Sequence, residues 1–142
     1  MKNTLIILFA GACLFFNSCT KKTSTAMVNE MVDTTTAVLK YQGNFQKGPY
    51  GTVSGSVMIY QTNGKWQLKL TNFSTTNGPD LKVYLSKEVQ PLSFIKLGDL
   101  KSTTGNQVYD INGSPDFMQY KYALIHCEQY NHLFGSAELM MP

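Results

Sequence analysis

The stretch VSGSVMIYQTNGKWQLKLT, residues 53–71, decides the fold class of this chain. Asn63-Gly64 near its middle is the dipeptide that most readily supplies the positive φ values of a tight hairpin turn. On both sides of this turn, apolar residues alternate with polar or small ones, so each strand has one buried and one solvent-facing side. The residues expected to point inward are Val53, Gly55, Val57, Ile59, Trp66, Leu68 and Leu70. The stretch therefore predicts a β-hairpin with strands over 53–60 and 65–71.

Short alternating runs continue after this hairpin and are separated by turn residues. In the run over 81–85, the two leucines and the valine are expected to point inward, with Lys82 and Tyr84 outward. Asp80, just before this run, follows Gly78-Pro79 and is expected to cap a turn rather than to act as a general acid. Further strands are expected over 107–111, 120–127 and 136–140. We therefore predict an all-β fold, a single-domain antiparallel β-sandwich or flattened barrel.

The strand expected over 120–127 is largely apolar on both faces. One face carries Ala123, Ile125 and Cys127, and the other carries Tyr122, Leu124 and His126. A strand of this kind belongs in the centre of a sheet, where protein covers both of its sides. Because adjacent side chains point to opposite faces, the sheet is expected to separate His126 from Cys127.

The N-terminus carries an apolar run from Leu5 to Phe16 after a single lysine. This run is too short to span a membrane, which takes about 20 residues, but it suits the core of a secretory signal. Ser18 then precedes Cys19, and the arrangement resembles a bacterial lipoprotein signal, in which the cysteine is acylated and becomes the mature N-terminus. The resemblance implies a membrane anchor through lipid on Cys19.

These features divide the chain into three parts. Residues 1–18 are predicted to be the lipoprotein signal peptide, 19–42 a threonine-rich flexible tether, and 43–142 the β domain. The expected location is the bacterial cell envelope after export, with a preference for the outer membrane because Thr20 after Cys19 provides no acidic retention signal.

Cysteine usage leaves one thiol in the mature protein. Cys13 leaves with the signal peptide and Cys19 carries lipid, so Cys127 has no partner for an internal disulfide. An unpaired cysteine in an oxidising compartment is expected to be buried, functional or paired with another molecule.

Charge and motifs exclude several function classes. The chain has twelve basic residues, all lysines, against nine acids, and without arginine or a dense basic patch a nucleic-acid partner is not expected. Bidentate recognition of phosphate by arginine is excluded. Nucleophile elbows, glycine-rich phosphate loops and His-Glu-x-x-His motifs are absent. The domain is therefore not expected to be an enzyme by itself.

Cys127, His132 and Met140 or Met141 superficially resemble part of a blue-copper metal site. Such a centre needs two histidines and a cysteine around one metal. The only other histidine is His126, which should lie across the sheet from Cys127. No metal site is therefore expected, and we interpret His126 as a half-buried strand residue and His132 as a loop or edge residue.

A series of segments resembles a known family. These segments are NGPDLKVYLS (77–86), LGDLKSTTGNQVYDI (97–111), IHC (125–127) and FGSAEL (134–139). In this order they resemble the DM-thirteen domain, or "electron transfer DM", family over roughly 43–139. The resemblance implies a β-rich extracellular module whose characteristic cysteine corresponds to Cys127. In the family this cysteine is proposed to act in electron transfer, either as a bare thiol or by holding a prosthetic group such as haem.

This sequence departs from the family pattern at two positions. Many members have a histidine where this chain has Gly51, and a tryptophan where it has His126. The missing histidine argues against a haem or metal site built from it and Cys127, while a bare thiol is unaffected.

Two functions follow as hypotheses. The first is a lipid-anchored redox module in which Cys127 reacts or holds a group, with a redox or envelope protein as its partner. The second is a non-catalytic cell-envelope binding or scaffold domain in which Cys127 is buried in the core. A reactive thiol needs solvent access and a pKa below about 8.5, whereas free cysteine is among the most buried residue types. The accessibility of Cys127 therefore separates the two hypotheses.

Overall fold

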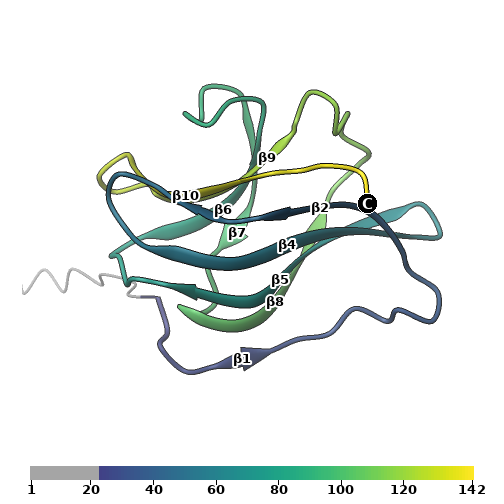
Figure 1. Cartoon of the computed structure of the whole chain (residues 1–142), viewed down its shortest axis with the longest axis horizontal. Helices are drawn as coiled ribbons and strands as arrows, with labels where there is room; N and C mark the ends of the chain where they lie inside the picture. Colours follow the sequence, from purple (N-terminus) through teal and green to yellow (C-terminus); the bar gives the residue numbers. More distant parts are fainter. Residues whose placement is uncertain (1–22) are drawn as a thin grey trace, which may run out of the picture.

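The computed structural model describes residues 23–142 as two five-stranded sheets packed face to face (Figure 1). The first sheet has the order β1 (Val28–Asn29), β8 (Thr104–Ile111), β5 (Lys65–Thr75), β4 (Val53–Thr62), β2 (Val38–Asn44). The second has the order β3 (Gln46–Lys47), β10 (His132–Glu138), β9 (Tyr122–Cys127), β6 (Leu81–Ser86), β7 (Phe94–Asp99). The sheets do not close into a barrel, so the predicted all-β fold is confirmed as a sandwich. None of the described residues belongs to a helix long and apolar enough to cross a membrane.

The predicted hairpin forms as β4 and β5. Its turn residues Asn63 and Gly64 have φ values of 48° and 78°, and the strands pair from Thr62 opposite Lys65 onward. These are the left-handed values that a two-residue turn with right-handed strand twist requires. The sequence signal at Asn63-Gly64 therefore sets the register of the first sheet.

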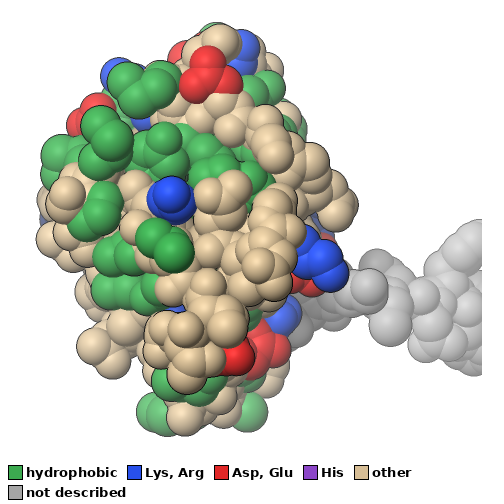
Figure 2. Space-filling model, turned by 90° about the vertical axis from the view of Figure 1, so that its right-hand side faces the viewer, with side chains coloured by type: hydrophobic (Ala, Val, Ile, Leu, Met, Phe, Trp, Pro, Cys, Tyr) green, Lys and Arg blue, Asp and Glu red, His purple; other side chains and the backbone are tan. Residues whose placement is uncertain are grey.

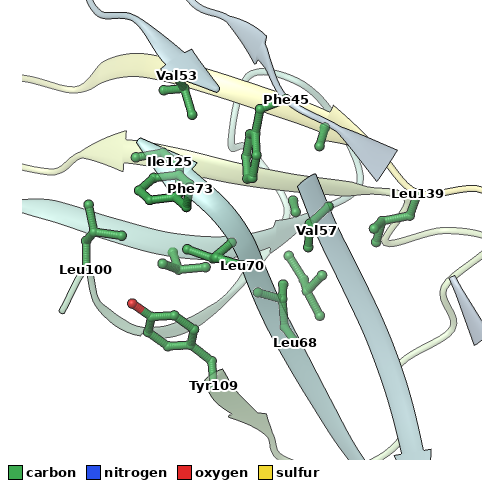
Figure 3. Close-up of a cluster of buried hydrophobic side chains, with 14 of the residues drawn as sticks. Phe45, Val53, Val57, Leu68, Leu70, Phe73, Leu100, Tyr109, Ile125 and Leu139 are labelled. Carbon is green, nitrogen blue, oxygen red and sulfur yellow. The ribbon is translucent and has the colours of Figure 1, made fainter. Parts of the chain in front are cut away.

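The inner faces of the two sheets form one apolar core (Figure 3). The first sheet contributes Val57, Leu68 and Leu70, all fully buried, and the second contributes Ile125. Tyr109 of β8 enters the same cluster and donates its hydroxyl to the Gln107 side chain at 2.9 Å. Burying such residues contributes roughly 1.5–3 kcal/mol each, so the sandwich is held mainly by contact between these two faces.

The outer face of the second sheet is also covered, which corrects the expectation that Lys82 and Tyr84 point to solvent. Every residue of β6 is buried, and Tyr84 packs with Leu124 and Leu133 in a second apolar cluster. Phe94 of the edge strand β7 stacks on the Tyr84 ring with centroids 4.3 Å apart. A strand with protein on both sides loses the exposed face that simple alternation assumes.

The predicted tether boundary at residue 42 differs from the structure. The signal peptide over 1–18 and residues 19–22 lie outside the described residues, but β2 begins at Val38 and pairs with β4 over its whole length. Upstream of it, the segment from Ser24 to Glu30, here called the N-terminal strap, lies along β8. The sequence does not predict this segment, because its strand β1 has only two paired residues, too few to show an alternation of apolar and polar side chains.

Hydrogen bonds hold the N-terminal strap in place. Thr103 donates its amide to the Ser24 carbonyl at 2.9 Å, and Glu30 donates its amide to the Asn106 carbonyl at 2.9 Å. The Glu30 carboxylate accepts from Lys101 Nζ at 2.7 Å and from the Val108 amide at 2.7 Å. Burial raises the pKa of the Glu30 carboxyl, but these hydrogen bonds outweigh it and the net shift is downward. The strap is therefore part of the folded domain.

The remaining strand predictions vary in accuracy. The strands expected over 107–111 and 120–127 are found as β8 and β9, and β9 is central as expected. The last strand runs from His132 to Glu138 rather than over 136–140, because the turn after Cys127 is short and Asn131 takes a left-handed φ of 53°. Strand β7 was not predicted.

The end of the sandwich near the C-terminus is apolar. A surface groove there is lined by Tyr41, Phe117, Met118, Leu139, Met140 and Met141, together with Lys121 and Glu138. Met118 is 71 % exposed, and hydrophobic side chains gather on this face of the molecule (Figure 2). We call this surface the methionine end.

We expect Gly105→Ala to detach the N-terminal strap. Gly105 has a φ of 103°, and a Cβ there would overlap the Val28 carbonyl. Gly113→Ala is the matched control, since its φ is 76° but nothing lies within 4 Å. In both variants, backbone strain should lower the free energy of unfolding by about 1–2 kcal/mol. In Gly105→Ala, lost hydrogen bonds should lower it by about 1–3 kcal/mol more.

Urea denaturation measures these losses, and amide hydrogen exchange at Glu30 and Thr103 reports on the strap itself. Exchange at these two amides should accelerate only in Gly105→Ala. Equal exchange in the two variants would contradict the role of the strap contacts.

Candidate functional site

Strand β9 places Cys127 and His126 on opposite sides of the second sheet. Its neighbours are β6, where Leu81 pairs with Cys127, and β10, where His132 pairs with Cys127. Side chains alternate along a strand, so Cys127 faces the core between the sheets and His126 faces outward. The separation expected from the sequence is confirmed, and the two side chains cannot share one ligand.

The Cys127 thiol is enclosed by apolar packing. The residue is 1 % exposed and belongs to the main core cluster. It is the one free cysteine among the described residues. A thiol reacts as the thiolate, which needs solvent and a nearby cation or dipole. In this conformation Cys127 behaves as a small apolar core residue.

His126 is more buried than the half-buried position expected for it. The residue is 3 % exposed, and its ring lies on Tyr84 with centroids 5.5 Å apart. Nε2 lies 3.1 Å from Asn131 Oδ1, while Nδ1 has no hydrogen-bond partner within residues 23–142. Burial lowers the pKa of this imidazole, and the bond to Asn131 and the Glu128 carboxylate only partly offset the effect. His126 is therefore held neutral near pH 7.

A hydrogen-bonded group covers the outer side of His126. The Tyr84 hydroxyl donates to Glu128 Oε1 at 2.5 Å, and Lys96 Nζ donates to both Glu128 oxygens at 2.7 and 2.9 Å. Burial raises the pKa of the Tyr84 phenol, and Glu128 raises it further. Hydrogen bonds from Lys96 and then from Tyr84 lower the pKa of the Glu128 carboxyl. The phenol stays protonated and the carboxylate ionised, so neither is poised for proton transfer at neutral pH.

His132, expected in a loop or at an edge, is the first residue of β10, an inner strand of its sheet. Its ring stacks on Tyr50 with centroids 3.6 Å apart and an interplanar angle of 2°, and Tyr130 lies 5.7 Å away on centroids. The loop that carries Tyr50 is bonded to β10, because Gly48 donates its amide to the Phe134 carbonyl at 2.6 Å. These aromatic rings form a fixed surface rather than a ligand set.

The Asp80 carboxylate, expected to cap a turn, forms an ion pair in the structure. The Lys82 ammonium bridges Asp80 at 2.6 Å and Asp99 at 2.5 Å. Burial lowers the pKa of Lys82, but the two carboxylates outweigh it and the net shift is upward. Both acids therefore neutralise a nearly buried ammonium.

The residues around Cys127 do not fit a haem or a metal ion. No group of three or more His, Cys, Asp or Glu residues in the described part of the chain could hold a metal. At position 51, where the resemblance places a histidine, a Cβ would lie only 2.5 Å from Phe134 Cδ1. Phe134 and Cys127 belong to the same core cluster, so an aromatic ring occupies the space that an upstream ligand would need.

Comparison of the sequence with models of known protein families identifies the family of this domain. The sequence model of the family described as Electron transfer DM13 matches residues 44–139. The chain belongs to the DM13 family. No curated protein and no solved structure matches it. The match starts at the last residue of β2 and ends just beyond β10, so this DM13 domain has its N-terminal strap outside the matched region.

Of the two residues assigned a role from the sequence, only Cys127 belongs to the described part of this DM13 domain, and it lies in the core. Cys127 lies where the family resemblance places the characteristic cysteine, and Cys19 lies outside the described residues. Sequence reasoning missed the group formed by Tyr84, Lys96 and Glu128, whose members come from three strands or their ends. These three residues are brought together by the order of the strands in the sheet. Their spacing along the chain therefore does not predict the contacts between them.

We expect the free energy of unfolding to fall as pH is lowered below about 6.5, the pKa of histidine in an unfolded chain. The folded-state pKa of His126 is lowered, so the unfolded state binds more protons in this range and acid favours unfolding. In His126→Gln this part of the pH dependence should disappear. Urea denaturation between pH 7 and pH 5 measures the effect.

His132→Gln is the matched control, because it removes the other histidine from the neighbouring strand. In His132→Gln, the free energy of unfolding should still fall as the pH is lowered from 7 to 5. A pH dependence that vanishes in His132→Gln and persists in His126→Gln would contradict the assignment.

Proposed function

We propose that this DM13 module is a bacterial lipoprotein of the cell envelope that acts as a binding or scaffold domain, with Cys127 as a core residue. The observation that carries this proposal is the burial of Cys127 in the apolar core. Two charged groups nearby, Glu128 and Lys82, are held in ion pairs. A module without an exposed thiol or a metal cluster among residues 23–142 is best suited to recognition through its surface.

A redox function through Cys127 is the second candidate. It is favoured by the family match, because the family is described as an electron transfer family. It requires an open state in which the turn over 128–131 moves and exposes the thiol at the end of β9. Local openings of this kind cost between about zero and the full free energy of unfolding.

Thiol labelling of the folded protein separates these candidates. We expect Cys127 to react at least about a thousandfold more slowly than an exposed thiol introduced by Met118→Cys, since local opening of a core strand costs several kcal/mol. The reaction is followed by mass spectrometry on the peptide that contains Cys127, so Cys13 and Cys19 do not interfere. Comparable rates for the two thiols would overturn the core role and support the redox candidate.

Membrane anchoring is tested at Cys19. We expect the N-terminal peptide of protein purified from bacterial membranes to begin at Cys19 and to carry acyl chains. Cys19→Ser should abolish the acyl mass of the N-terminal peptide, because serine has no thiol to accept the lipid. Cys13→Ser is the control and should leave acylation intact. An unacylated wild-type chain would refute the lipoprotein proposal.

A further inference from the structure

One end of the sandwich lies next to the proposed lipid anchor. Ser24 is fixed on the first sheet through its bridge to Ser102, and Thr23 and Ser24 line a depression together with Asp80 and Lys101. The Asp80 carbonyl accepts the Glu128 amide at 3.0 Å, so the turn between β9 and β10 lies at the same end. Figure 1 shows the described chain starting at the end where this turn lies. We call it the anchor end.

The connection from Cys19 to Thr23 is short. Four residues span at most about 14 Å when fully extended. The strands β4 and β5 have 10 and 11 residues, which corresponds to a length of about 35 Å at the usual rise per residue. A lipid on Cys19 would therefore keep the anchor end close to the bilayer and leave the methionine end far from its attachment point.

The anchor end presents side chains that suit a lipid headgroup layer. Tyr50 is 56 % exposed and Tyr130 is 57 % exposed, and both lie beside the His132 ring. Tyrosine combines an apolar ring with a polar tip, and it is enriched where membrane and water meet. The stack with His132 holds the rings in place before binding, which reduces the entropy cost of docking.

The charges at this end are compatible with an anionic surface. Glu128 is paired with Lys96, and Asp80 is paired with Lys82. Lys47 of the exposed strand β3 lies close to the Tyr50 loop in sequence, and Lys21 and Lys22 follow the proposed acylation site. Lysines near an anionic leaflet contribute roughly 1 kcal/mol each.

We propose that Tyr50 and Tyr130 dock the anchor end of the domain on the headgroup layer of its own membrane, so that the sandwich stands on the bilayer with the methionine end pointing away. This inference rests on the proposed lipid anchor at Cys19. It commits to a lipid surface as the partner of the anchor end.

The test uses the processed, acylated protein in vesicles of phosphatidylethanolamine and phosphatidylglycerol that carry a fluorescent headgroup acceptor. A donor dye is attached through Gln129→Cys at the anchor end or through Met118→Cys at the methionine end, both exposed positions. We expect energy transfer to the headgroups to be several-fold stronger from the first position. Replacing both tyrosines with serine should reduce this difference, whereas Leu92→Ser, which removes another exposed apolar side chain, should not.

The outcomes distinguish the two proposals. An acylated protein with equal transfer from the two positions, or with stronger transfer from position 118, overturns docking and leaves the anchor intact. An unchanged difference after Tyr50→Ser with Tyr130→Ser also overturns docking by these rings. A chain without acyl groups, as judged by the mass of its N-terminal peptide, overturns both proposals together.

Discussion

Side chains of a strand point alternately to the two faces of its sheet, and in β9 protein covers both faces. Ile125 and Cys127 pack into the core between the sheets, while Leu124 and His126 pack under Tyr84 and its neighbours. This double coverage fixes β9 in the centre of its sheet and determines what its end can do. The thiol and the imidazole are adjacent in the chain but lie in separate compartments, so the apparent metal motif is a consequence of strand packing.

Polar groups around this strand are satisfied in ways that limit their chemistry. Glu128 is held by Lys96 and Tyr84, and Lys82 is held by two carboxylates. A residue suited to acid–base catalysis has a pKa near the working pH, whereas these contacts move the pKa values of Tyr84 and Glu128 apart. The unpartnered Nδ1 of His126 is the one exception among the described buried side chains. Burial lowers the pKa of this imidazole, so we expect the region to be sensitive to acid.

The sequence was sufficient for the fold class because Asn63-Gly64 and the alternation beside it act locally. It was also sufficient to separate His126 from Cys127, since that follows from strand geometry alone. It failed at Tyr84 and Lys82, because the second cover of β6 comes from β7 and from β10, whose position depends on the sheet order. Long-range contacts such as Glu30 with Lys101 likewise have no periodic pattern, so the start of the domain was placed too late.

The N-terminal strap also bears on how far the domain would extend from the lipid attachment proposed at Cys19. While Ser24 to Glu30 lie along β8, about four residues of sequence separate Cys19 from the described domain. Release of these seven residues would add roughly 23 Å of extended chain without breaking the inter-sheet core. Gly105 allows the close approach of Val28. It therefore affects the distance between the domain and the proposed lipid on Cys19 as well as the contact between the strap and β8. With the proposed lipid on Cys19, the domain would have two possible heights above the membrane, and the strap would hold it at the lower one.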